Sequence, residues 1–435
     1  MPAALHAQAK ASPNQRFHAR CDKVYRPDVL ALAYACGKAN GGAAGVDGQT
    51  FADIETDGLD RWLGELAEAL RVKTYRPDPV RRVWIPKPDG KPRPLGIPTI
   101  RDRVVQTAAM VVLTPIFEAD LQPEQYAYRA ERSALDAVSH VRKLLKSGHT
   151  QGVDADLSGY FDAIPHAELM RCLARRIVDG AMLHLVKMWL VAPVEEIDER
   201  GNRPRTTRNK DEGRGTPQGA PISPLLSNLY LNEVDQMLER AKEVTREGRY
   251  THLEYARFAD DLVILVDDYR RWDWLVKAVY QRLMEELAKL DVQVNTDKTR
   301  LVDRMRGESL GFLGFEFRRV RTLRGKGGVR CGPKMQARTA LLRKLKEVFR
   351  RHVSQPVHRV ITLINPILRG WVNHFRFGHS SRCFGFMRDW VEKKIRRHLL
   401  RARKRKGFGW KRWSRDGLYD ALGLYADYRV GRTQA

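Results

Sequence analysis

Residues 255–265 read YARFADDLVIL, two short apolar runs that flank the acidic pair Asp260-Asp261. The runs Tyr255–Phe258 and Leu262–Val266 have the aromatic and β-branched residues typical of strands, which predicts a hairpin with the carboxylates at its tip. Adjacent carboxylates on a tight turn repel each other unless a positive group compensates, and Mg²⁺ prefers oxygen ligands of this kind. Taken alone, the pair also fits an ordinary surface turn, because aspartate favours turns.

A second acidic position lies earlier in the chain. Asp156 closes the short apolar run Val153–Leu157, which predicts a strand, and the sequence continues as SGYFD to Asp162. Two divalent ions held between carboxylates can activate an attacking hydroxyl and stabilise a departing pyrophosphate. We therefore expect Asp156 to converge with the acidic hairpin, whereas Asp162 is assigned a structural hydrogen-bonding role.

The rest of the chain alternates between helices and short strands. Apolar residues at helical spacing predict helices, and the Pro-rich segment around Asp89-Gly90 predicts a hairpin at an edge or flap. Residues 1–20 look like a loose lead-in, and the pattern beyond Pro333 is helical to the end. The predicted helices are 59–72, 101–117, 133–146, 166–177, 221–241 and 272–290. The further predicted strands are 83–85, 292–294 and 312–317. Residues 195–214 are predicted to form a loop or a small hairpin.

The positive charge is concentrated near the C-terminus. The 435 residues carry a formal charge of +26, from 78 Lys and Arg against 52 Asp and Glu. From Arg321 onward there are 30 basic and 6 acidic residues, which predicts a polyanionic partner rather than a merely solvated face. Interleaved aromatic rings favour stacking on nucleic acid over a lipid surface; they are Trp371, Phe375, Phe377, Trp390, Phe408, Trp410 and Trp413.

The composition excludes several classes of protein. With 43% hydrophobic residues the chain can bury a core, which excludes a wholly disordered protein. The five cysteines never form Cys-x-x-Cys, which excludes a disulfide framework and paired-thiolate zinc sites. The longest apolar stretch, 107–117, is too short to cross a bilayer, and the N-terminus lacks a secretory signal. We expect a soluble protein of the bacterial cytosol or nucleoid without a membrane partner; the sequence neither requires nor excludes a homo-oligomer.

Seven blocks in the same order resemble the reverse transcriptases and maturases encoded by group II introns, in the form that lacks an endonuclease domain. Any one block would be a weak signal, but together they extend the resemblance from about Gly45 to about Gly423. The blocks are IPKPDGKPRPLGIP (85–98), DLSGYFD (156–162), GTPQGAPISPLLSN (215–228), FADD (258–261), VNTDKTRLV (294–302), FLGF (312–315) and LRGWVNHF (368–375).

This resemblance implies a fold and a domain order. The fold is α+β, a right-hand polymerase with helical fingers and a β flap, a ferredoxin-like palm that bears the three carboxylates, and an α-helical thumb, the maturase domain. The implied domains are an N-terminal extension with the start of the fingers (1–82), the fingers and palm (83–320), the helical thumb or maturase domain (321–400) and a basic segment that binds RNA or DNA (401–435).

The resemblance also implies roles for individual residues at the matching positions. Asp156, Asp260 and Asp261 would be catalytic and would hold two Mg²⁺ ions. Phe161 would lie beneath the sugar and exclude a ribose 2′-hydroxyl; a core aromatic is the alternative. The other nucleotide-binding residues would be Lys87, Arg93, Gln218 and Gly219, although Lys87 and Arg93 could instead be solvated charges of the hairpin. Lys298 and Gly314 would support the palm and the primer end. The residues that contact RNA would be Arg129, Arg132, Arg401, Arg403, Lys404, Arg405 and Lys406.

Some details depart from the family pattern. Phe258 replaces the usual tyrosine of the acidic box, which removes a hydroxyl but keeps the ring. The segment QYAYRAERS (125–133) lacks the glycines of the family's Phe-Gly-Phe-Arg-Pro-Gly-Arg-Ser, which affects the expected template contacts. His374, His379 and Cys383 lack metal-site spacing and are predicted to be structural, and Asp47 is predicted to be a turn residue.

The implied function is that of an RNA-directed DNA polymerase that extends a DNA primer on an RNA template with dNTPs. As a maturase it would also bind structured intron RNA and stabilise its folded form. One alternative is a domesticated reverse transcriptase without an intron, in phage defence or beside CRISPR adaptation proteins. The motif Gln-Gly-x-x-x-Ser-Pro at 218–224 disfavours a reverse transcriptase of a diversity-generating system. The maturase-like segment around Trp371 disfavours a retron reverse transcriptase. Another alternative is a splicing factor with an inactive polymerase, which the three intact carboxylates disfavour.

Overall fold

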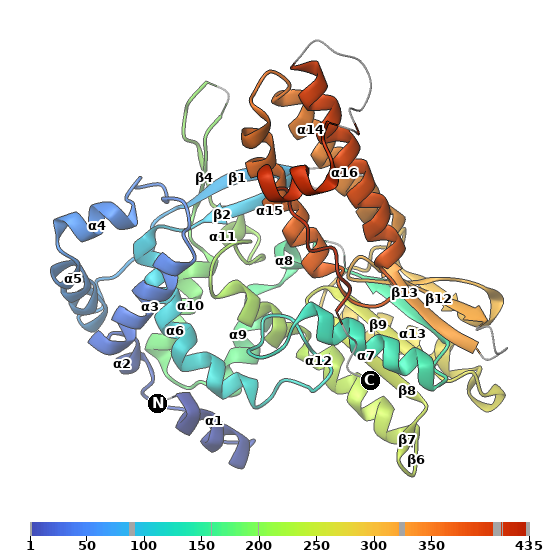
Figure 1. Ribbon diagram of the computed structural model, residues 1–435. Coiled ribbons are helices and arrows are strands. Elements are labelled where there is room, and N and C mark those ends of the chain that lie inside the picture. The colour runs from blue at the N-terminus through green and yellow to red at the C-terminus, as the bar shows by residue number, and fades with distance from the viewer. Residues whose placement is uncertain are drawn as a thin grey trace. The chain divides into compact units, whose positions relative to one another are not determined.

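The computed structural model describes residues 2–86, 92–157, 159–198, 200–321, 327–402, 410 and 412–431. Helices and sheets are mixed, as the sequence predicts, and the chain divides into two compact units (Figure 1). The first unit comprises 1–133, 155–262 and 277–299, and the second comprises 134–154, 263–276 and 300–435. Because these units are interleaved along the chain, the sequential domain boundaries implied by the sequence stay a prediction.

Helices make up most of the first unit. The largely buried helix α6 (Ile100–Glu118) contacts α1 (Pro2–Ala11), α2 (Cys21–Val24) and α3 (Pro27–Ala39). The predicted helices at 59–72, 101–117, 166–177 and 221–241 are confirmed, with shifted ends. The other helices with residues in this unit are α4 (Phe51–Asp57), α5 (Leu59–Arg71), α8 (Tyr160–Ala163), α9 (His166–Ala174), α10 (Gly180–Leu190), α11 (Arg208–Asp211), α12 (Ser223–Val244) and α13 (Leu275–Lys289).

The expectation of a loose lead-in over residues 1–20 is wrong. Residues 2–11 form α1, whose alanines have a high helix propensity. The Arg176 side chain is 4% exposed and anchors this segment, because its guanidinium donates to the carbonyls of Ala9 (2.9 Å) and Ser12 (3.0 Å). The same guanidinium pairs with Asp120 at 3.1 Å. A basic residue far along the chain therefore orders the N-terminal segment, which local sequence patterns do not reveal.

The predicted flap hairpin is present. Strands β1 (Val80–Pro86) and β2 (Pro92–Ile97) are antiparallel, with Val83 opposite Leu95. The short strand β4 (Val194–Glu196) runs parallel to β1 and pairs with β5 (Arg205–Thr206), which gives the order β2-β1-β4-β5. The small hairpin expected within 195–214 is thus confirmed, and the tip of the flap, 87–91, lies outside the described residues.

A second four-stranded sheet has the order β10-β3-β9-β8. The hairpin predicted from YARFADDLVIL is formed by β8 (Leu253–Phe258) and β9 (Asp261–Val266), and β9 is almost entirely buried. Strand β3 (Gln151–Asp156) also pairs antiparallel with β10 (Arg300–Asp303). The strand expected at 292–294 is wrong, since Val294 makes only an isolated bridge with Leu157. A two-stranded ribbon, β6 (Arg246–Glu247) and β7 (Tyr250–Thr251), precedes β8.

The second unit holds a three-stranded antiparallel sheet and a helical bundle. The sheet consists of β11 (Leu310–Phe312), β12 (Phe315–Arg321) and β13 (Gly327–Pro333), and α7 (Ala134–Ser147) contacts β13. The strand predicted at 312–317 is therefore divided between β11 and β12 by a turn at Leu313-Gly314. Strand β13 was not predicted, because its glycines and arginine give little apolar alternation.

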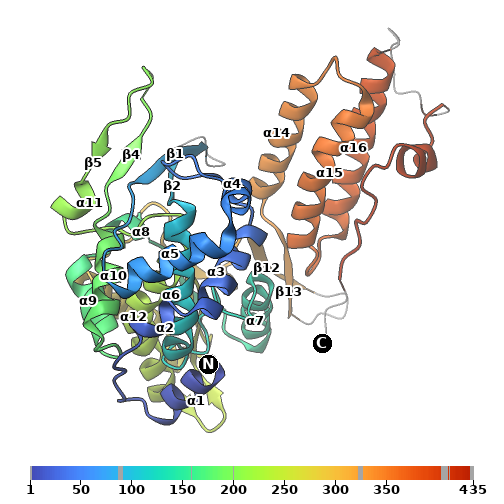
Figure 2. The ribbon, with the colours of Figure 1, turned by 90° about the vertical axis from the view of Figure 1, so that its left-hand side faces the viewer.

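The bundle consists of α14 (Met335–Arg351), α15 (Val357–His374) and α16 (Ser381–Arg401), which lie side by side in Figure 2. Leu345, Ile364 and Ile395 belong to its hydrophobic core. The expectation of helix to the end of the chain is wrong: in the described part beyond Ala402 only a π-helical turn, Gly417–Ala421, is present. No helix within the described ranges combines the length and apolar character needed to cross a bilayer.

Several rings expected to stack on nucleic acid are instead part of this bundle. Trp371, Trp390 and Trp413 pack against its core, and Phe375 is buried. Arg396 on α16 is 1% exposed and pairs with Glu392, also buried, at 3.2 Å. These four aromatic residues therefore serve packing, whereas Trp410 is 51% exposed.

Candidate active site

Three carboxylates gather at one end of the sheet β10-β3-β9-β8. Asp156 is the last residue of β3, Asp261 is the first of β9, and Asp260 lies in the turn between β8 and β9. Strands β3 and β9 are hydrogen-bonded neighbours in this sheet. The two acidic segments, far apart in the sequence, are therefore brought together by strand pairing.

The register of β3 and β9 explains this convergence. The Asp268 N–H donates to the Gly148 carbonyl at 3.3 Å. Gly152 lies four residues after Gly148, within β3. A Cβ on Gly152 would lie 2.1 Å from the Ile264 carbonyl oxygen, so only glycine fits there. These pairs run in opposite directions along the two strands, as antiparallel pairing requires. The same register, continued to the end of β3, places its terminal carboxylate opposite the acidic turn.

The charges of the site act on one another. Asp260 is half-buried, and its burial, followed by repulsion from Asp156, raises its pKa, while Arg93 and Lys298 lower it. Lys298 Nζ lies 2.9 Å from Asp156 Oδ2. The hydrogen bond to Asp156 and the negative charges of all three carboxylates raise the pKa of Lys298. A cation thus already balances part of the acidic cluster.

Asp156 is fixed in place by the turn that carries Lys298. The Asn295 N–H donates to the Asp156 carbonyl at 2.8 Å, and its side-chain amide donates to Asp156 Oδ2 at 3.2 Å. The Asp156 N–H donates to the Thr299 hydroxyl at 3.2 Å. Sequence analysis named Lys298 but missed Asn295 and Thr299, although both belong to the block VNTDKTRLV and are residue types that favour turns.

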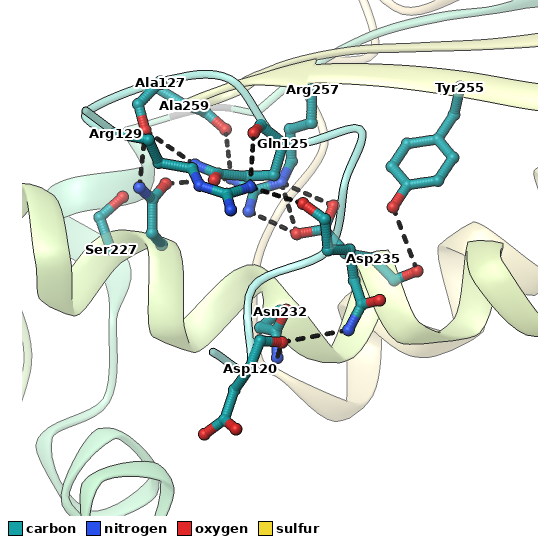
Figure 3. A network of polar contacts seen from close by, with 12 residues as sticks. Asp120, Gln125, Ala127, Arg129, Ser227, Asn232, Asp235, Tyr255, Arg257 and Ala259 are labelled. Carbon is teal, nitrogen blue, oxygen red and sulfur yellow. Dashed lines mark hydrogen bonds and ion pairs between the residues drawn. The ribbon is translucent and has the colours of Figure 1, made fainter. Parts of the chain in front are cut away.

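The acidic turn rests on a buried ion pair (Figure 3). Arg257 is 1% exposed, and its Nε lies 2.8 Å from Oδ1 of the fully buried Asp235 on α12. Its Nη1 donates to the carbonyl of Ala259 at 3.0 Å. Ala259 has a left-handed backbone with φ of +57°, a conformation that is costly for alanine. Arg257 therefore holds the backbone directly before Asp260.

This network extends into the segment that departs from the family pattern (Figure 3). The Tyr126 N–H donates to the Arg257 carbonyl, and Asn228 and Gln125 both donate to the Ala127 carbonyl at 2.8 Å. Arg129, predicted to contact RNA, points into the protein: its side chain is 6% exposed and pairs with Glu118. Its burial speaks against an RNA contact and indicates that it orders this segment.

Three of the predicted nucleotide-pocket residues lie together. Arg93 Nε on β2 donates to Gln218 Oε1 at 3.0 Å, and Gln218 Nε2 donates to Asp162 Oδ2 at 3.0 Å. Asp162 thus has the structural hydrogen bond expected of it. Gly219 has a φ of +113°, and a Cβ there would lie 2.5 Å from the Gly96 carbonyl oxygen, so this loop closes against β2 only with glycine.

Phe161 is 9% exposed in the short helix α8, and its carbonyl accepts from the Thr216 N–H at 2.8 Å. Its ring contacts Tyr160 in an edge-on arrangement with the centroids 5.7 Å apart. This placement is compatible with a core aromatic and with the floor of a sugar pocket. Tyr128, which the sequence analysis missed, is 54% exposed, and burial followed by the charge of Asp260 raises its pKa.

Other predicted positions are not joined to this cluster by the described contacts. Gly314 lies in the β11–β12 turn, where a Cβ would be 3.3 Å from the Phe375 ring. The half-buried Arg132 donates to backbone carbonyls of its own segment, and Arg401 ends α16. Lys87, Arg403, Lys404, Arg405 and Lys406 lie outside the described residues. An RNA, nucleotide or primer contact at these positions stays a prediction.

The donor set fits a magnesium site. Asp156, Asp260 and Asp261 offer only oxygen ligands, which Mg²⁺ prefers. The raised pKa of Asp260 reflects burial and like charge that a divalent cation would offset. Lys298 forms its ion pair with Asp156. These residues could therefore hold divalent metal ions, with the buried Arg257 fixing the turn beneath them.

Two family matches cover the flap, the carboxylates and the bundle. The family described as "Reverse transcriptase (RNA-dependent DNA polymerase)" matches residues 85–317, more than half of the chain. The family described as "Group II intron, maturase-specific domain" matches residues 338–416.

Similar curated proteins come from bacteria and yeast. The chain is 33% identical to protein YkfC of Escherichia coli (strain K12), over 68% of this chain and 82% of that protein. It is 26% identical to the group II intron-encoded protein LtrA of Lactococcus lactis subsp. cremoris, over 80% of this chain and 69% of that protein. It is 24% identical to an uncharacterized 91 kDa protein in the cob intron of Schizosaccharomyces pombe, over 83% of this chain and 51% of that protein.

Repulsion within the acidic cluster gives a test that needs no activity assay. We expect Asp260→Asn to raise the thermal unfolding midpoint of the metal-free protein by about 2 °C, since one half-buried like charge is removed. Adding MgCl₂ should raise the midpoint of the unaltered protein more than that of the variant. The exposed Asp297→Asn serves as control and should change neither value. Equal responses to Mg²⁺ in all three proteins would contradict a metal site at Asp260.

Proposed function

Because the chain belongs to the reverse transcriptases and maturases of group II introns, we propose how its residues carry out RNA-directed DNA synthesis. Asp156, Asp260 and Asp261 hold two Mg²⁺ ions, whose chemistry is to activate the primer 3′-hydroxyl and to stabilise the departing pyrophosphate. The observation that carries this proposal is the convergence of the end of β3 with the β8–β9 turn in one sheet.

The neighbouring residues bind and orient the incoming nucleotide. Arg93 binds the triphosphate together with Lys87, and Gln218 orients Arg93 through their hydrogen bond at 3.0 Å. Phe161 excludes a ribose 2′-hydroxyl. Lys298 holds the Asp156 side chain in position at the end of β3 through their ion pair.

In the right-hand description that we propose, the flap and the helices of the first unit are the fingers. The sheet β10-β3-β9-β8 is the palm, the bundle α14–α16 is the thumb or maturase domain, and the segment 401–435 extends it. The exposed arginines and lysines of the bundle support binding of structured intron RNA through its phosphates, and hence a role in splicing. Exposed examples are Arg343, Lys344, Arg350, Arg359, Arg369, Lys393 and Arg397. A location in the bacterial cytosol is part of this proposal.

The division between synthesis and RNA binding is tested by removing the acidic pair. We expect Asp260→Asn with Asp261→Asn to lower primer extension on an RNA template by at least two orders of magnitude, because the metal ligands are lost. Affinity for the intron RNA should stay within about twofold in a filter-binding assay. A large loss of RNA affinity would contradict the division, and retained synthesis would contradict the assignment of the carboxylates. RNA recovered with the protein and sequenced would separate an intron partner from a domesticated enzyme.

Sugar selection is tested at Phe161. We expect Phe161→Val to raise incorporation of ribonucleotides relative to deoxynucleotides by about tenfold or more, because a smaller side chain leaves room for the 2′-hydroxyl. Single-nucleotide extension with each sugar measures this ratio. The neighbouring Tyr160→Phe is the control, since its hydroxyl bonds to the Ser227 carbonyl and does not bear on the sugar. An unchanged ratio in Phe161→Val would leave Phe161 as a core aromatic.

The buried arginine beneath the turn is a positioning residue in this proposal. We expect Arg257→Lys to lower kcat for nucleotide addition by about 10- to 100-fold with little change in the KM for dNTP, because the carbonyl of Ala259 loses its donor. Arg246→Lys, an exposed ion-paired arginine in the same unit, is the control. A parallel change in KM, or loss of the folded state in a thermal melt, would show that Arg257 serves the fold and not the turn.

A further inference from the structure

A small cavity of about 190 Å³ in the second unit has no role in the chemistry described above. Two buried residues line it: Thr150, which immediately precedes β3, and Arg304, which follows β10. The Arg304 N–H donates to the Thr150 carbonyl at 3.1 Å, which ties the two residues together. Lys146, Asp268 and Arg319 line the same cavity and are exposed.

Buried hydrogen-bonding atoms in this cavity lack partners. Arg304 is 1% exposed, yet its Nε and Nη2 have no hydrogen-bond partner among the described residues. The Thr150 hydroxyl is likewise buried and unpartnered within the described part of the chain. Buried guanidinium nitrogens without partners are costly, because they have lost their hydrogen bonds to water and gained none in return. Both residues with these unpartnered atoms line the same cavity, which favours a ligand there that completes their hydrogen bonds.

The charge of the cavity selects an anion. Lys146, Arg304 and Arg319 are cations, whereas Asp268 supplies one negative charge, so the lining has a positive excess. Burial, followed by the positive charge of Arg319, lowers the pKa of Arg304 to about 10, which still leaves it charged at neutral pH. Burial and the neighbouring Asp267 raise the pKa of Asp268, and the positive charge of Arg319 opposes them.

The size of the cavity and the donor types narrow the ligand further. A guanidinium fork with a hydroxyl donor matches the oxygens of a phosphate group. The volume is below the range of about 300–1,000 Å³ usual for sites that enclose whole small molecules, which favours a single phosphate over a nucleotide. Six residues of extended chain separate Thr150 from Asp156, about 20 Å at the rise of a strand, so the cavity is distinct from the acidic cluster.

We propose that Thr150, Arg304 and Arg319 form a phosphate-binding site, which in the working protein holds a backbone phosphate of the bound RNA. The source of the phosphate rests on the proposed function, whereas the phosphate chemistry follows from the cavity itself. Arg304 provides the buried donors at its base, Thr150 adds a hydroxyl, and Arg319 with Lys146 attracts the phosphate at the rim.

The first arm of the test uses inorganic phosphate and the full chain. We expect phosphate to raise the thermal midpoint of the unaltered protein over chloride at equal ionic strength, and Arg304→Met and Arg319→Ala to lose this shift. Without phosphate, Arg304→Met should be at least as stable as the unaltered protein, because an apolar side chain replaces an unpaired buried charge. Arg306→Ala, an exposed arginine paired with Asp303, is the control and should keep the shift. The absence of any phosphate shift, or a shift that survives in Arg304→Met, would overturn the site.

The second arm identifies the source of the phosphate. We expect Arg304→Met and Arg319→Ala to weaken RNA binding about three- to tenfold and to reduce the slope of log affinity against log salt by about 0.7 to 0.9, the value of one phosphate contact. A lost phosphate shift with an unchanged RNA slope would overturn the RNA assignment and leave a site for free phosphate. Primer extension by the control Arg306→Ala should equal that of the unaltered protein. If even the unaltered protein does not extend a primer, the proposed function fails while the phosphate arm still stands.

Discussion

Mutual repulsion among three carboxylates is the constraint on which the rest of the site depends. The sheet brings Asp156 to the turn that carries Asp260, although both side chains are partly withdrawn from water. Such a cluster is unfavourable in itself, so the surrounding structure must hold it together. The pairing of β3 with β9 does this along the sheet, and the ion pair of Arg257 with Asp235 does it from below the turn. These contacts hold the acidic segments in fixed positions, as the positioning of reacting groups requires.

Buried arginines order different segments of the chain. Arg176, Arg257 and Arg396 are all nearly inaccessible, and each pairs with a carboxylate while also donating to backbone carbonyls. The planar guanidinium, with five donors in fixed directions, lets one side chain order a whole segment. Arg304 is equally buried but leaves donors unmatched among the described residues. Arg304 differs in this from Arg257 and Arg396, which have no buried nitrogen without a partner among the described residues.

The acidic hairpin and the flap could be predicted from the sequence because their signals are local. Alternating apolar runs, a tight acidic turn and a Pro-rich return each specify structure within a few residues. The anchoring of α1 by Arg176 and the support of the Ala259 turn by Arg257 could not, since each depends on partners distant in the sequence. Arg257 even lies inside the diagnostic stretch, where a lone arginine between apolar residues gives no sign of its buried partner. The order of the sequence blocks therefore predicted where the site lies, but it did not predict the residues that support the site.

The aromatic residues of the bundle change how its contact with RNA must be understood. Trp371, Trp390 and Trp413 pack against the helix core, which removes them from the stacking surface that composition suggested. The exposed cations of α14–α16 remain, and cations contact phosphates without reading bases. Discrimination of an intron RNA by this surface then depends on the arrangement of phosphates in the folded RNA. A pocket that seats one phosphate with buried donors would add a fixed reference point to such a surface, because its geometry cannot adjust as a flexible lysine can.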